Sequence, residues 1–97
     1  MGQTAARLVL YHRYGCHLCE DMLDRLRELE VAWGFSLQIR DVDAEPELVR
    51  WFDDKVPLLQ GDGDEICRYV LNEQALGAFV KTQKLETRLD PEPSLTG

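Results

Sequence analysis

The sequence predicts an α/β fold in which three helices pack against a mixed four-stranded sheet, in the order β-α-β-α-β-β-α. Short apolar segments alternate with amphipathic helical segments, which is the pattern of α/β domains. A glycine-rich turn at residues 61–64 joins the last two strands, so these two strands are expected to pair antiparallel. The chain has 97 residues, which fits a single domain because smaller pieces would bury too little apolar surface.

The first strand and the first helix are predicted on either side of a glycine. Residues 7–11 form a short apolar run rich in strand-forming residues, and Gly15 supplies the turn that follows. From Cys16 onward, apolar residues recur every three or four positions, as they do on one face of a helix. They are Leu18, Cys19, Met22, Leu23, Leu26 and Leu29. Gly34 is expected to end this helix.

The middle of the chain carries shorter patterns. Alternating apolar and polar residues predict a strand over residues 35–42, which a right-handed crossover places parallel to the first strand. Residues 43–54 are predicted to form a short helix with Pro46 in its first turn. Residues 56–60 and 65–69 are the predicted strands of the hairpin.

The last predicted helix begins after Asn72, whose side chain is a good N-cap. Its expected buried face consists of Ala75, Leu76, Phe79 and Val80. Residues 1–85 are predicted to form the domain. Residues 86–97 contain two prolines and little apolar content, so a disordered tail is expected there. Together these elements give the smallest form of the thioredoxin-like fold.

Composition excludes several classes of function. The formal net charge is −7, and the basic residues form no stripe along the sequence. Both features argue against nucleic-acid binding. No apolar run approaches the roughly 18 residues of a membrane span, and the first ten residues lack the apolar core of a signal peptide. We therefore expect a cytoplasmic protein that binds neither nucleic acid nor membrane.

Two of the three cysteines form a C-x-x-C motif where the first strand ends and the first helix begins. Unpaired N–H groups at a helix start stabilise an anion, so the thiolate of Cys16 is favoured. Cys19 lies one turn further, on the apolar face, and its thiol is expected to stay protonated until Cys16 carries a mixed disulfide. The third cysteine, Cys67, is expected to be a buried, inert thiol, with a third redox or metal thiol as the alternative.

Neighbouring charges and metal binding leave alternatives open. His17, when protonated, and Arg13 add positive charge beside the thiolate, whereas Glu20 and Asp21 oppose it. The same cysteines could hold zinc or an iron–sulfur cluster with a histidine or a second subunit, although the sequence has no second C-x-x-C. A third hypothesis is an interaction domain with vestigial cysteines.

The C-x-x-C segment also carries a family resemblance. Residues 11–19 resemble the active-site segment of glutaredoxins, and residues 41–48 are similar to the segment that enters the second glutaredoxin helix. Val56 and Pro57 stand where that family carries its cis-proline. The similarity spans residues 8–84, and the CHLC motif with V-P-L-L and the Asp-Gly turn is closest to a branch of small, poorly characterised glutaredoxin-like proteins.

The resemblance implies thiol–disulfide exchange, with Cys16 as nucleophile, Cys19 as resolving cysteine, and Val56 and Pro57 lining the substrate site. It also places Arg13 where it would meet a glutathione carboxylate and Glu73 where it would take the glutathione amine. Two departures are visible. His17 and Leu18 replace the Pro-Tyr of glutaredoxins, and the bulky residues 69–71 replace a Gly-Gly pair that lets the backbone hold glutathione.

The sequence therefore predicts a monomeric thiol–disulfide oxidoreductase. Its expected substrates are protein or low-molecular-weight disulfides, and its expected reductant is of the glutathione or thioredoxin type. No organic cofactor and no metal is expected.

Overall fold

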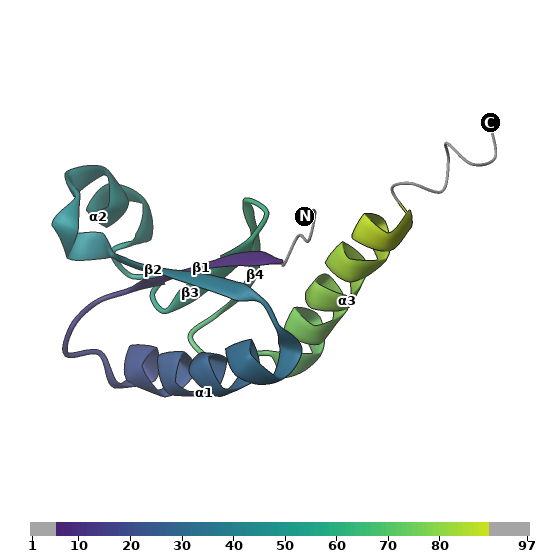
Figure 1. The fold of residues 1–97 in the computed structure, drawn as a ribbon. Coiled ribbons are helices and arrows are strands. Elements are labelled where there is room, and N and C mark those ends of the chain that lie inside the picture. The colour runs from purple at the N-terminus through teal and green to yellow at the C-terminus, as the bar shows by residue number, and fades with distance from the viewer. Residues whose placement is uncertain (1–5, 90–97) are drawn as a thin grey trace.

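The computed structural model describes residues 6–89 of the chain (Figure 1). Its elements are β1 (Arg7–His12), α1 (His17–Trp33), β2 (Ser36–Asp41), the 3-10 turn η1 (Val42–Ala44), α2 (Pro46–Phe52), β3 (Leu58–Gly61), β4 (Asp64–Arg68) and α3 (Glu73–Leu89). The predicted order β-α-β-α-β-β-α and the thioredoxin-like fold are confirmed.

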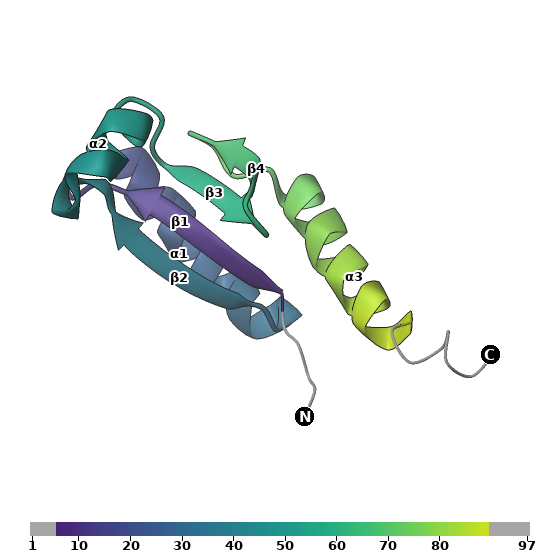
Figure 2. The same cartoon turned by 90° about the horizontal axis from the view of Figure 1, so that it is seen from above.

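The strands form one mixed sheet in the order β2-β1-β3-β4. Strand β1 pairs in parallel with β2, from Arg7 opposite Ser36 to His12 opposite Asp41, and α1 makes the crossover. Strands β1 and β3 pair antiparallel, as do β3 and β4. Figure 2 shows the four strands side by side with α1 behind them. The sheet therefore combines a parallel half and a hairpin half, as expected from the glycine-rich turn.

Helices cover both faces of the sheet (Figures 1 and 2). Leu8 and Leu10 of β1 point toward α1 and α3 and belong to the larger core, whereas Tyr11 packs on the other face with α2. Alternation along a strand sends neighbouring side chains to opposite faces. Leu10, Leu26, Leu59 and Leu76 of the larger core are fully buried. Each such side chain contributes about 1.5–3 kcal/mol relative to an exposed one.

The predicted second helix is interrupted. The sequence predicted one helix over residues 43–54, but η1 ends at Ala44 and α2 begins at Pro46, with Glu45 extended between them at φ −136° and ψ 127°. A residue before proline is disfavoured in the helical region because the proline ring clashes with its backbone. Pro46 therefore begins α2 and separates it from η1.

Helix α3 begins as predicted and ends later. The Asn72 side-chain oxygen accepts a hydrogen bond from the Ala75 N–H at 3.0 Å, which confirms the N-cap. The helix continues to Leu89, so the prediction of a tail from residue 86 was wrong for residues 86–89. Residues 86–90 contain no proline, and the Glu, Arg and Leu residues in this range favour helix. The next proline is Pro91. The remainder of the predicted tail, residues 90–97, lies outside the described residues.

Close packing of α3 on the sheet depends on Gly61 at the end of β3. A Cβ atom at this position would lie 2.6 Å from the Cζ atom of Phe79 and 2.8 Å from the Cδ1 atom of Ile66. Such distances are shorter than van der Waals contact, so only glycine fits beneath the Phe79 ring. Within the described residues, no helix is long and apolar enough to cross a membrane.

Candidate active site

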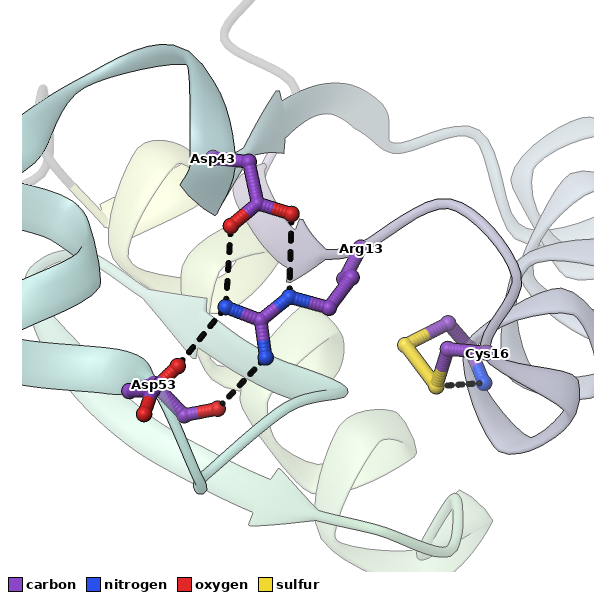
Figure 3. Close-up of a disulfide and its surroundings, with 5 residues drawn as sticks. Arg13, Cys16, Asp43 and Asp53 are labelled. Carbon is purple, nitrogen blue, oxygen red and sulfur yellow. Dashed lines mark hydrogen bonds and ion pairs between the residues drawn. A yellow bond between two sulfur atoms is a disulfide. The ribbon is translucent and has the colours of Figure 1, made fainter.

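The cysteine pair occupies the start of α1. Cys16 and Cys19 are joined by a disulfide with a Cα–Cα distance of 5.1 Å. Cys16 is the N-cap in an extended conformation, and its Sγ accepts a hydrogen bond from the Cys19 N–H at 3.1 Å (Figure 3). The backbone turns into this position at Gly15, which has a φ of +80°. An unpaired helix-start N–H is thus directed at the sulfur, an arrangement that favours a thiolate once the disulfide is reduced.

The two cysteines differ in access to solvent. Cys19 is 1% exposed and lies among the buried residues of α1, whereas Cys16 is half-buried at the helix end. His17, the first residue of α1, is exposed beside Cys16. An incoming disulfide therefore has access to Cys16 rather than to Cys19.

Arg13, in the loop before Cys16, is held by two aspartates. Its Nε and Nη2 atoms donate to the Asp43 carboxylate at 3.0 and 2.9 Å. Its Nη2 and Nη1 atoms donate to the Asp53 side chain and carbonyl oxygen at 2.8 and 3.0 Å. We call these three residues the Arg13 cluster. It ties the loop before α1 to η1 and to the end of α2.

The Arg13 cluster directs the guanidinium away from the cysteine pair (Figure 3). Its hydrogen bonds to Asp43 and Asp53 raise the pKa of Arg13, and the bonds from Arg13 lower the pKa of Asp43. The positive charge predicted to lie beside the thiolate is therefore paired with two carboxylates of the chain itself.

Glu73, at the first turn of α3, has a similar partner. Its carboxylate accepts hydrogen bonds from Arg25 Nε at 2.7 Å and Nη2 at 3.1 Å, which join α3 to α1. These bonds lower the pKa of Glu73. The sequence offered Glu73 as a partner for a ligand amine, and in the structure a side chain of this chain takes that place.

Val56 and Pro57 precede β3 and are joined by a cis peptide bond. The Pro57 side chain is fully buried, and Val56 packs against the smaller core under α2. The Pro57 carbonyl oxygen accepts a hydrogen bond from the Tyr69 N–H at 2.7 Å. This bond connects the segment before β3 to the segment between β4 and α3.

A groove that the sequence did not reveal lies between the start of α1 and the segment that links β4 to α3. It is an open depression of about 190 Å³. Its lining residues are Leu18, Asp21, Met22, Tyr69, Val70 and Leu71. We call it the apolar groove. Three large apolar side chains on it face solvent: Leu18 is 48% exposed, Tyr69 41% and Val70 71%.

Leu18 was predicted to share the buried helix face with Cys19, and this was wrong. Leu18 lies in the first turn of α1 and is 48% exposed, although it stands four residues before the buried Met22. The core of α1 takes Cys19, Met22, Leu26 and Leu29, at steps of three and four residues. Spacing along the helix therefore carries no signal of this exposure, since Leu18 stands at a normal four-residue step from Met22.

Tyr69 forms a fixed wall of the apolar groove. Its backbone has a φ of +69°, a left-handed conformation that is uncommon for a bulky residue. Its N–H donates to Pro57, and its Oη donates to the Asp54 carbonyl oxygen at 2.8 Å. The Arg68 guanidinium lies 5.9 Å from the centre of its ring. These contacts hold Tyr69 in place and leave Val70 exposed at the rim.

Cys67 of β4 is separate from the pair. Its thiol is free and half-buried, slightly more accessible than the predicted buried thiol, and it packs against the larger core. Burial raises the pKa of the Cys67 thiol. Within residues 6–89, no group of three or more His, Cys, Asp or Glu side chains is placed to hold a metal ion.

A family comparison agrees with this geometry. The model of the family described as "Glutaredoxin-like domain (DUF836)" matches residues 7–90. The chain belongs to this family. The match includes the C-x-x-C motif, the hairpin and all of α3, so it extends over residues 86–89 of the predicted tail.

Solved structures with the same fold include two bacterial proteins and a thioredoxin. Protein Ne2328 from Nitrosomonas europaea is 36% identical, with a TM-score of 0.71, and the match covers 80% of this chain and 94% of Ne2328. Protein XcR50 from X. campestris is 25% identical, with a TM-score of 0.62 and coverage of 77% and 96%. Thioredoxin 1 from Thermosipho africanus is 15% identical, with a TM-score of 0.58 and coverage of 80% and 98%, and shows the fold alone. No curated protein matches the chain.

Proposed function

We propose that this glutaredoxin-like domain is a thiol–disulfide oxidoreductase that cycles between a Cys16–Cys19 dithiol and disulfide. One observation carries the proposal: the paired cysteines lie at a helix start, with the accessible Cys16 sulfur as the N-cap and Cys19 buried behind it. Of the two sulfurs, Cys16 is accessible to a substrate and is stabilised as a thiolate by the helix N–H groups.

The reaction transfers two electrons from the pair to a substrate disulfide. The Cys16 thiolate attacks one substrate sulfur, forms a mixed disulfide and releases the other sulfur as a thiolate, which takes a proton from water. Cys19 then loses its proton and attacks the Cys16 Sγ atom. The Cys16–Cys19 bond forms as the mixed disulfide breaks, and the second substrate thiol leaves. Counted from the dithiol, and thus including the proton that Cys16 releases to solvent when it ionises, the pair loses two electrons and two protons, and the substrate gains the same number.

The remaining site residues have supporting roles in this proposal. His17 contributes positive charge beside Cys16 when it is protonated. Val56, which is half-buried, lines the side of the substrate site nearest β3, with the buried Pro57 behind it. Arg13 and Glu73 act as positioning residues, since their ion pairs fix the loop before α1 and the start of α3.

The biological setting is part of the proposal. We propose a monomer in the cytoplasm that acts on protein or low-molecular-weight disulfides and is reduced by a thiol system of the glutathione or thioredoxin type. Because both half-reactions use only cysteine sulfurs, no organic cofactor is needed.

A redox titration in defined thiol buffers tests the proposal. Alkylation followed by mass spectrometry reports each cysteine separately. We expect Cys16 and Cys19 to oxidise together at about −300 to −150 mV, the range of intracellular exchange proteins. Cys67 is the internal control, because it is not part of the disulfide, and we expect it to stay reduced. A pair that forms no disulfide in that range would contradict the proposal.

Metal analysis separates this function from the alternative use of the same cysteines. Protein purified under reducing conditions is expected to contain no stoichiometric zinc or iron. A stoichiometric metal that protects Cys16 and Cys19 from alkylation would favour the metal-binding function instead.

A further inference from the structure

We propose that the apolar groove binds the segment that flanks the disulfide of a protein substrate, and that it favours a segment with a large apolar residue and a basic residue next to the cysteine. The inference rests on the proposed function and adds its substrate class. It also predicts that oxidised glutathione, which is anionic, is a poorer substrate than such a segment.

The apolar groove begins at the turn of α1 that holds the cysteine pair. Leu18, one of its walls, stands between Cys16 and Cys19 in the chain, and Asp21 and Met22 continue it along the next turn of α1. A substrate whose sulfur contacts Cys16 therefore brings its neighbouring residues to this surface. The groove thus borders the turn of α1 that carries the disulfide.

The exposed side chains of the groove favour an apolar partner. Val70 is 71% exposed, and Leu18 and Tyr69 lie beside the same depression with more than a third of their surfaces exposed. Contiguous exposed apolar surface on a small domain marks a site of interaction, because burying it against another apolar group removes it from water.

The shape of the groove is fixed before a substrate arrives. Tyr69 keeps its left-handed backbone because two hydrogen bonds, to Pro57 and Asp54, hold it on either side. An unusual backbone conformation is retained only where surrounding contacts determine it. A preformed wall loses little conformational entropy on binding, which suits a groove that recognises side chains.

The charge around the groove favours a basic partner. Of its six lining residues, only Asp21 is charged. Arg13, Arg25 and Arg68 each donate through at least two nitrogens to carboxylates of the same chain, so their charges are already compensated. With a net charge of −7 on the whole chain, a cationic segment is attracted and an anionic disulfide is repelled.

The experiment measures second-order rates of oxidation of the reduced protein at a single pH of about 7.5. The probes are symmetric disulfides of three capped tripeptides, Leu-Cys-Lys, Leu-Cys-Glu and Ser-Cys-Lys, together with oxidised glutathione and the neutral disulfide of 2-mercaptoethanol. Each rate is divided by the rate of the same probe with dithiothreitol, which corrects for intrinsic reactivity. We expect the corrected rate of the Leu-Cys-Lys disulfide to be about tenfold higher than that of oxidised glutathione. It should be about threefold higher than that of each other peptide disulfide.

Variants locate the effect on the groove. Val70→Ser is expected to lower the ratio of the Leu-Cys-Lys rate to the 2-mercaptoethanol disulfide rate by about fivefold. Asp21→Asn is expected to reduce the preference for Lys over Glu by about threefold. The matched controls are Val31→Ser, 86% exposed elsewhere on α1, and Asp24→Asn, an exposed carboxylate outside the groove. Both controls should keep the wild-type ratios.

The outcomes separate the two proposals. A reduced protein that does not react with the neutral disulfide contradicts the proposed function itself. A second outcome is a protein that reacts with the neutral disulfide but shows equal corrected rates for the three peptides and oxidised glutathione. That result would support the proposed function and contradict the proposed substrate class. If Val31→Ser lowers the ratio of the Leu-Cys-Lys rate to the 2-mercaptoethanol disulfide rate as much as Val70→Ser does, the assignment to the groove is also contradicted.

Discussion

Two regions border the start of α1, and they are opposite in character. The Arg13 cluster concentrates charge, yet all of its charges are directed at one another, and it joins the loop before Cys16 to η1 and α2. The apolar groove carries one charge and leaves large apolar side chains in water. The comparison shows that a charged residue near a reactive centre can serve the scaffold, while the surface open to a partner is apolar.

This contrast changes the expected use of the site. A free arginine and a free glutamate beside a cysteine pair would favour a small zwitterionic ligand. In this chain both are bound to side chains more than 25 residues away in sequence, Arg13 to Asp43 and Glu73 to Arg25. The apolar side chains of the groove, by contrast, remain exposed to a substrate.

The largest expected effect comes from the cysteines between the two regions. Cys16→Ser should lower exchange with any disulfide by more than about 100-fold, because serine provides no thiolate. Cys19→Ser should instead trap a mixed disulfide on Cys16, visible by mass spectrometry as a substrate adduct that dithiothreitol removes. Finding the adduct on Cys19 in a Cys16→Ser protein would reverse the assigned roles.

A smaller effect is expected from the wall of the groove. Tyr69→Phe removes the hydrogen bond to the Asp54 carbonyl oxygen and keeps the ring, so Tyr69 loses one of the two hydrogen bonds that hold it in place. The rate with the Leu-Cys-Lys disulfide should fall about two- to threefold relative to the 2-mercaptoethanol disulfide. Tyr14→Phe is the matched control, because Tyr14 is 79% exposed and outside the groove. Equal effects of the two changes would argue against a preformed wall.

A substitution in the Arg13 cluster should change thermal stability rather than substrate preference. Arg13→Gln removes the cluster's guanidinium and is expected to lower the thermal unfolding midpoint by about 2–4 °C, since exposed ion pairs contribute little individually. The ratios among the peptide disulfides should remain those of the wild type. Arg50→Gln, an exposed arginine of α2, is the control. A changed peptide preference in Arg13→Gln would show that this arginine meets the substrate.

The smallest expected effect is a pH dependence of the stability that the Arg13 cluster contributes. Arg13 holds the pKa of Asp43 below its usual range, so this carboxylate contributes stability that is fully present above the pKa of an unfolded aspartate, about 3.9. The contribution is lost as the pH falls through the lower pKa of the folded state. Carbon-detected NMR titration of Asp43 should show the depressed value in the wild type and a value closer to normal in Arg13→Gln.

Local signals in the sequence predicted most of the fold. Gly34 was expected to end α1, and its left-handed φ of +75° and hydrogen bond to Glu30 show that it does. Asn72 was expected to cap α3, and it does. These features depend on residues within one helical turn, which is why spacing and residue type suffice.

The rest depended on contacts that spacing does not encode. Whether Arg13 and Glu73 are free or paired is decided by Asp43, Asp53 and Arg25, which the fold brings together from distant elements. The groove likewise needs the start of α1 and the segment after β4 in one place. The pairing of a charge and the exposure of an apolar side chain are therefore properties of tertiary structure, even where the motif itself is local.

Gly61 has a consequence that reaches the start of α3. Because the Phe79 ring lies directly over this glycine, a methyl group there would act as a wedge and tilt the helix away from the sheet. Only Asn72 separates Leu71 of the groove from the start of α3. A change as small as one carbon atom on the sheet would then alter the width of the substrate opening from a distance, without touching a residue that the substrate meets.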